Sequence, residues 1–239
     1  MRPFRRKAAL MATRMSTDRN LHRLMTWMSP SYPVGAYSFS HGLESATESG
    51  LVCNPLTVRN WIDDLMTFGG GQADLIFLAE AWEAAGDRDR LAEVHELALA
   101  FQPTAEIRLE STAQGAAFIK VTAAAWPCPA LGLLAQPAGG EYVYPVVVGA
   151  IAASHRMPKN EIMGAYAHAF AANLVSAAVR LVPLGQTDGQ KIMASLLEDV
   201  HTAVVTALST PLAMVSSSCV MADIASMQHE VQYTRLFRS

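Results

Sequence analysis

Hydrophobic residues recur at intervals of three and four along almost the whole chain, whereas alternation with a period of two is nearly absent. Intervals of three and four place side chains on one face of an α-helix, so the sequence predicts an all-α fold. Ile192, Leu196, Val200 and Val204, for example, recur every four residues and predict one buried helical stripe. The chain contains neither an internal repeat nor a low-complexity linker. We therefore expect a single-domain bundle of about ten helices over residues 16–239.

Capping and helix-breaking residues set the expected helix boundaries. An asparagine side chain can cap the first turn of a helix, and proline is tolerated at the first helical position because the N–H that it lacks has no partner there. Asn54 and Pro55 therefore predict the start of a helix. The apolar run at 146–148 could form a strand, but no partner strand is evident, so we expect a helix there as well. The other expected helices cover 55–68, 72–85, 87–101 and 104–126, with further ones beginning at Pro158 and at a capping box from Thr187 to Gln190, and a surface loop is expected over 131–144.

The composition favours a binding protein over several other classes. Hydrophobic residues make up 51% and charged residues only 16% of the chain, which is more apolar surface than a monomer usually needs. The net charge of −3 argues against a nucleic-acid partner. Three widely spaced cysteines suggest neither disulfides nor a zinc ribbon and fit a reducing cytoplasm. No uninterrupted apolar window is long enough for a membrane span.

The first fourteen residues contain five basic residues and no acidic one. This superficially resembles an organellar transit peptide. We instead expect residues 1–15 to be a disordered leader, or to precede a functional start near Met15.

Enzyme motifs are absent from the sequence. It contains no GxxxxGK[ST] phosphate loop, no GxGxxG run and no HExxH metal site. The serines, histidine and glutamate between Ser29 and Glu44 could suggest a hydrolase. However, Ser40 and His41 would point apart on one helical turn, and no GxSxG motif is present. We expect no enzyme activity, and interpret Tyr37, His41 and Glu44, spaced four and three apart, as one helical recognition face.

Four long segments occur in the order typical of one family. They are PVGAYSFSHGLESATESGLV, TAEIRLESTAQGAAF, NLVSAAVRLVPLGQTDGQ and HEVQYTRLFRS, and they span the chain from about Leu21 to Ser239. Together they resemble the signature segments of the UreF family of urease accessory proteins. The resemblance implies a cytoplasmic, dimeric, non-catalytic scaffold without a cofactor of its own. It also implies that the protein assembles with UreD, also called UreH, and the GTPase UreG, and delivers nickel to apo-urease.

The resemblance also assigns candidate binding residues. In this family the C-terminal region is similar to a docking element for UreD, so we expect the segment from about residue 230 to 239 to be flexible alone and to fold on that partner. Its aromatic, leucine and arginine side chains are typical of binding hot spots. The alternative is a segment packed on its own core. The candidate docking residues are Gln232, Tyr233, Arg235, Leu236, Phe237 and Arg238.

Two further pairs of residues are candidate contacts. The resemblance places Tyr37 and Glu44 on the surface that contacts UreG, although Ala36 and His41 depart from the usual family pattern. Arg180 lies among apolar neighbours and must find an acceptor or solvent. With Gln186 it is a candidate dimer or partner contact, and capping of a helix end is the alternative.

Two other functions stay open at this stage. A nickel-binding metallochaperone would need ligands, and Cys219 with His229 is the only candidate pair near the C-terminal end, although ten residues separate them. A GTPase-activating protein for UreG would need an arginine supplied in trans, and no arginine is marked as one.

Overall fold

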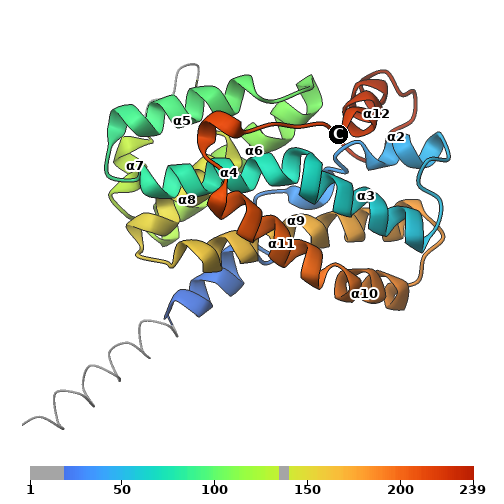
Figure 1. Ribbon diagram of the computed structural model, residues 1–239, viewed down its shortest axis with the longest axis horizontal. Helices are drawn as coiled ribbons and strands as arrows, with labels where there is room; N and C mark the ends of the chain where they lie inside the picture. Colours follow the sequence, from blue (N-terminus) through green and yellow to red (C-terminus); the bar gives the residue numbers. More distant parts are fainter. Residues whose placement is uncertain (1–18, 135–139) are drawn as a thin grey trace, which may run out of the picture.

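The computed structural model describes residues 19–134 and 140–239, and within these ranges the chain is helical with no strand. Figure 1 shows one bundle of packed helices, which confirms the predicted all-α fold. The expected leader at 1–15 lies outside the described residues. The described part of the chain starts with helical residues 19–27 and continues through η1 (Ala36–Ser38), α2 (Leu43–Glu48), α3 (Pro55–Phe68), α4 (Gly70–Glu83), α5 (Arg88–Ala100), α6 (Ala105–Ala125), α7 (Ala130–Leu133), α8 (Tyr144–Ser154), α9 (Lys159–Leu181), α10 (Gln186–Ser195), α11 (Leu197–Ser209), η3 (Leu212–Met214) and α12 (Val220–Glu230).

Helix α4 lies at the centre of the bundle and packs most extensively against α8. A glycine allows this close approach, because a Cβ atom at Gly149 would lie 2.3 Å from the carbonyl oxygen of Leu78. The side chains of α8 from Val146 to Ala152 are fully buried. The apolar run at 146–148 is therefore helical as predicted, and its lack of polar residues reflects burial on every side.

The local signals predicted some boundaries correctly and others wrongly. Asn54 caps α3 by accepting a hydrogen bond from the Thr57 amide at 3.0 Å, as expected. The predicted loop at 131–144 is partly wrong, because α7 ends inside it. The capping box was also misplaced: α10 begins at Gln186, and it is the side chain of Asp188, not that of Gln190, that accepts from the amide of the capping residue Gly185.

Helix α9 is long and apolar enough, by length and composition alone, to cross a membrane. Half of its most apolar stretch is buried inside the bundle, where α9 packs against α4, α10 and α11. The core helix of a globular bundle has the same composition. The apolar character of α9 is therefore explained by the helices that cover it.

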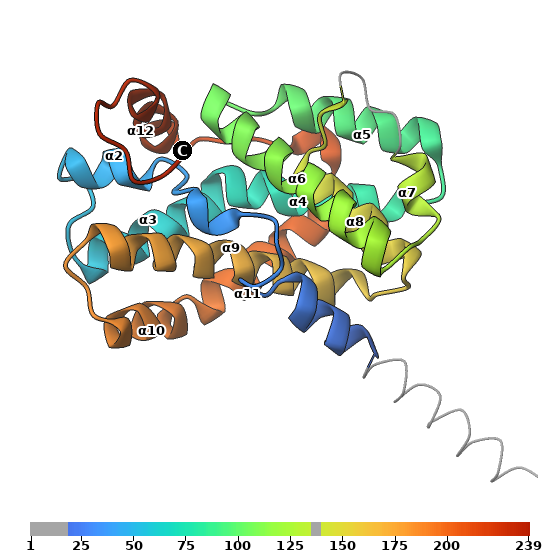
Figure 2. The same ribbon diagram turned by 180° about the vertical axis from the view of Figure 1, so that it is seen from behind.

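Helices α2 and α12, far apart in sequence, lie side by side in both views of the molecule (Figures 1 and 2). Gly42 permits this contact, because its Cβ would lie 3.0 Å from the backbone nitrogen of Ser226. Gly42 and the preceding His41 both have a positive φ, of 78° and 55°. This left-handed turn redirects the chain between η1 and α2 and leaves a docking place for the residues that follow α12.

Candidate partner-binding site

The residues after α12, 231–239, fold back onto their own chain, and we call them the tail. Two of its backbone amides donate hydrogen bonds to one buried carboxylate. The amides of Leu236 and Phe237 lie 2.7 and 2.9 Å from the carboxylate oxygens of Glu44. The side chain of Arg235 donates to Glu106 at 2.9 Å. Glu44 lies on α2 and Glu106 on α6, so the tail joins two helices that are distant in sequence.

His229, at the end of α12, connects these two carboxylates. Its Nδ1 lies 2.7 Å from Glu106 and its Nε2 lies 3.0 Å from Glu44. The side chain is 0% exposed, and those of the two glutamates are less than 10% exposed. Glu44, Glu106, His229 and Arg235 form what we call the tail network. A buried carboxylate is stable only when it has hydrogen-bond partners, and Glu44 and Glu106 both have them here.

The last residues of the tail bind the turn before α2. The amide of Arg238 donates to the carbonyl of Ser38 at 2.8 Å, and both the amide and the hydroxyl of Ser40 donate to the main-chain oxygen of Ser239. Phe237 is buried, and the guanidinium of Arg180 on α9 stacks 4.2 Å from the centre of its ring. The tail thus packs on its own core, which is the alternative arrangement considered from the sequence.

The outer face of the tail carries apolar side chains that no residue of 19–134 or 140–239 covers. Tyr233 is fully exposed and Leu236 is 64% exposed, although the Leu236 amide is held by Glu44. Helix α12 also exposes apolar residues at helical spacing. These are Val220, Met221, Ile224, Met227 and, just after the helix, Val231.

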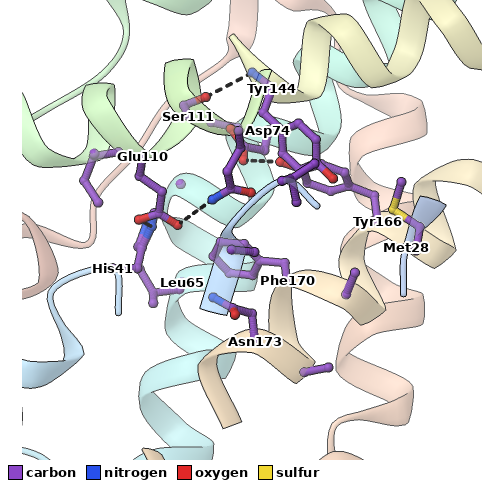
Figure 3. Close-up of a pocket in the computed structure, with 18 of the residues that line it drawn as sticks. Met28, His41, Leu65, Asp74, Glu110, Ser111, Tyr144, Tyr166, Phe170 and Asn173 are labelled. Atoms are coloured by element: carbon purple, nitrogen blue, oxygen red, sulfur yellow. Dashed lines mark hydrogen bonds and ion pairs between the residues drawn. The ribbon is translucent and has the colours of Figure 1, made fainter. Parts of the chain in front are cut away.

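A cavity of about 270 Å³ lies between η1, α4, α6 and α9 (Figure 3). Aromatic rings and a few polar groups line it, and the hydroxyl of Tyr166 donates to Asp74 at 2.7 Å. His41 lies 3.3 Å from Glu110, which also accepts a hydrogen bond from the Ser239 hydroxyl. The cavity and the tail therefore share Glu110.

The cavity perturbs its ionisable groups. Burial raises the pKa of Asp74 to about 6, although the hydrogen bond from Tyr166 and the charge of His41 act in the opposite direction. Burial alone would lower the pKa of His41, but the carboxylates of Glu110, Asp74 and Asp223 outweigh it and the net shift is upward. The cavity therefore combines apolar walls with an excess of acidic groups.

The structure separates the residues that we expected on one recognition face. Tyr37 lies in η1 and is exposed, whereas Glu44 lies in α2 with its carboxylate inside the tail network. The predicted continuous helical face is wrong, because the left-handed turn at His41 interrupts it. In this structure Tyr37 is available to a partner and Glu44 is covered by the tail.

Arg180 has internal partners as well as its contact with Phe237. Its guanidinium donates to the carbonyl of Tyr37 at 2.9 Å and to that of Ser176 at 3.2 Å. The first bond joins α9 to η1. The second ends on Ser176, whose carbonyl is not among the last four of α9 that lack a partner within the helix, so it does not cap the helix end. Gln186 is exposed at the start of α10.

The weak metal candidates do not come together in the structure. Both nitrogens of His229 face carboxylates, and the thiol of Cys219 donates to the carbonyl of Asp64 at 3.0 Å. Burial raises the pKa of this thiol to about 11, which disfavours the thiolate that binds metal. Within residues 19–134 and 140–239, no group of three or more His, Cys, Asp or Glu side chains could hold a metal ion.

Sequence reasoning missed Glu106, Glu110 and Asp74. The first two are four residues apart in α6, so they share one face, and both are buried. Two glutamates on the same face as Ile107 and Gln114 could have indicated a buried polar contact. Asp74 gave a weaker signal, because its partner Tyr166 is 92 residues away in sequence.

Over the described residues the protein is an all-helical bundle whose tail presents exposed apolar side chains on a buried polar support. Comparison with known proteins gives its family. The UreF family model matches residues 52–197. Proteins named urease accessory protein UreF from a Bradyrhizobium species and from Rhodopseudomonas palustris are each 46% identical over 92% of this chain and 92% and 91% of their own length. One from Granulibacter bethesdensis is 44% identical over 95% of this chain and 97% of its own. The chain belongs to the UreF family of urease accessory proteins.

Proposed function

We propose that the protein is a non-catalytic, cytoplasmic scaffold, acting as a homodimer, that assembles with UreD and the GTPase UreG and delivers nickel to apo-urease. Membership of the family supports a role in urease maturation. The large share of apolar residues and their exposure on α12 and the tail support a protein whose surface is covered by partners.

The proposal rests on one observation: hydrogen bonds hold the backbone of the tail on the core, whereas side chains on its outer face are exposed to solvent. Glu44 and Ser38 hold the backbone of residues 236–238, while Tyr233 and Leu236 point outward. A surface that is ordered before binding loses little conformational entropy when a partner covers it. We therefore assign this face to UreD, and the exposed Tyr37 to the surface that recruits UreG.

The test is co-purification of UreD with a tail variant. Replacing both Tyr233 and Leu236 by alanine should reduce retention of UreD at least tenfold, because truncation of a tyrosine hot spot typically costs about 2 kcal/mol and about 1.4 kcal/mol is a factor of ten in affinity. Leu56→Ala is the matched control, because Leu56 is 66% exposed on α3, away from the tail. Full retention by the double variant, with helicity unchanged, would refute the assignment.

A further inference from the structure

The cavity between η1, α4, α6 and α9 contains an acid whose capacity to accept hydrogen bonds is largely unused. Asp74 lies on α4, and its Oδ2 accepts a hydrogen bond from the hydroxyl of Tyr166 at 2.7 Å. Its other oxygen, Oδ1, has no hydrogen-bond partner among residues 19–134 and 140–239. A carboxylate can accept about four hydrogen bonds, so Asp74 can take a further donor that enters the cavity.

The other charged side chains of the cavity are mainly acidic as well. Glu110 and Asp223 line it together with Asp74, whereas no lysine or arginine of the described residues does. His41 offsets part of this charge, since it lies 3.3 Å from Glu110. Even if His41 and the second lining histidine, His168, were both protonated, the three carboxylates would outnumber them. The charge of the cavity therefore favours a cation over an anion.

Aromatic rings form much of the remaining wall and decide between kinds of cation (Figure 3). The ring centroids of Tyr144 and Tyr166 lie 5.5 Å apart, and those of Phe170 and His41 lie 5.3 Å apart. The face of an aromatic ring attracts a cation, more strongly where water is excluded, and also packs against alkyl groups. Within the described residues, by contrast, no group of three or more His, Cys, Asp or Glu side chains could hold a metal ion. The walls therefore favour an organic cation.

The size and the unpaired groups of the cavity indicate a small occupant. Its volume is about 270 Å³. A cavity of about 150 Å³ is large enough for benzene, so the occupant has about ten non-hydrogen atoms at most. The indole N–H of Trp27, which lines the cavity and is 1% exposed, has no acceptor among the described residues. Buried polar groups are normally paired, so this donor also needs an acceptor that those residues do not supply, such as a water molecule or an oxygen atom of the occupant.

We propose that this cavity binds a small organic ammonium ion, a protonated primary amine whose N–H groups donate to Oδ1 of Asp74 and whose alkyl part packs on Tyr144 and Phe170. The bound cation supplies the positive charge that Asp74 lacks, so the ionised carboxylate no longer destabilises the folded state. This site does not depend on the assignment of UreD to the tail, because none of the exposed tail side chains lines the cavity.

Calorimetric titration of the full-length protein with butylammonium chloride at pH 8 tests the proposal. At this pH Asp74 is ionised, since its pKa is about 6, and an alkylamine keeps its proton, as a lysine side chain with a pKa of about 10.4 does. The matched neutral ligand is 1-butanol, which has the same chain length without the charge. Butylammonium should bind about tenfold more tightly or better, because hydrogen bonds to charged groups are the stronger ones. Equal affinities, or no saturable binding of butylammonium, would overturn the proposal.

Asp74→Asn removes the charge and keeps the size of the side chain. It should weaken the binding of butylammonium about tenfold or more and leave that of 1-butanol unchanged. Asp89→Asn is the control, because Asp89 is exposed on α5 and does not line the cavity, and it should bind both ligands like the wild type. Unaltered binding of butylammonium by Asp74→Asn would place the cation elsewhere and overturn the site.

Phe170→Leu tests the aromatic wall. Leucine offers an apolar surface without an aromatic face, so the affinity for butylammonium should fall about two- to fivefold while that for 1-butanol stays the same. Circular dichroism checks that the helices are intact. Equal losses for the two ligands would show that Phe170 provides apolar surface alone, and would refute its contact with the cation.

Discussion

The tail network and the central cavity both bury carboxylates, but they satisfy them differently. Glu44 accepts from two backbone amides and lies 3.0 Å from Nε2 of His229, and Glu106 accepts from Arg235 and lies 2.7 Å from Nδ1 of His229. Asp74 in the cavity accepts from the hydroxyl of Tyr166, its only hydrogen bond among the described residues, and its pKa is raised to about 6.

The difference shows what buried acids contribute in this protein. A carboxylate with a full set of donors stabilises the arrangement of the elements that provide them, here α2, α6, α12 and the tail. A carboxylate with one neutral donor beside an open cavity instead makes the folded state less stable when it ionises. Substitution of the acid should therefore destabilise the protein in the first region and stabilise it in the second.

The largest effect is expected for Glu44→Ala. The substitution leaves His229 and the amides of Leu236 and Phe237 buried without their acceptor. Leaving a buried donor without its acceptor typically costs about 1–3 kcal/mol, and because several contacts are lost together we expect a loss of about 3–5 kcal/mol in the free energy of unfolding. Denaturant unfolding at pH 7 measures it.

Glu48→Ala is the control for this prediction, because Glu48 lies on the same helix and is exposed. It should change the free energy of unfolding by less than about 0.5 kcal/mol. If Glu44→Ala cost no more than the control, the tail network would not stabilise the fold.

The second prediction has the opposite sign. Asp74 has a folded pKa of about 6 and an unfolded pKa of 3.8, so the folded state binds the proton more tightly. Its contribution to stability is complete below pH 3.8 and is lost as the pH rises through 6. The shift of about two pKa units corresponds to about 3 kcal/mol. An asparagine side chain stays neutral at every pH, so Asp74→Asn should raise the free energy of unfolding by up to about 3 kcal/mol at pH 8.

The pH dependence distinguishes this explanation from better packing. The advantage of Asp74→Asn, measured by urea unfolding, should shrink steadily between pH 8 and pH 4, because the wild-type carboxyl becomes protonated over this range. A gain of equal size at both ends of the range would show that the charge of Asp74 is not responsible.

The sequence predicted the fold far better than the site, for a physical reason. Helical periodicity and the cap at Asn54 are local signals, and both were confirmed. The tail network instead joins Glu44 to His229, Leu236 and Phe237, which lie 185, 192 and 193 positions further along the chain. A single sequence shows no such contact. Glu44 therefore looked like a surface acid on a helix. The assignment of Tyr233 and Leu236 to partner docking stays a prediction, and the structure adds only that both side chains are exposed.

The smallest effect is expected at the edge of the tail network, for Arg180→Lys. Arginine stacks its planar guanidinium on Phe237 while donating to the carbonyls of Tyr37 and Ser176, and a lysine ammonium cannot make all three contacts. A cation–π contact at a partly exposed position contributes about 0.5–1 kcal/mol, so urea unfolding should show a loss of about that size. Arg90→Lys is the control, because Arg90 is half exposed and pairs only with Glu80 among the described residues. Since Arg180 lies outside the paired charges beneath the tail, its loss should leave the amide hydrogen exchange of Leu236 unchanged. A cost as large as that of Glu44→Ala would instead mean that the stacked ring, and not the buried carboxylate, holds the tail.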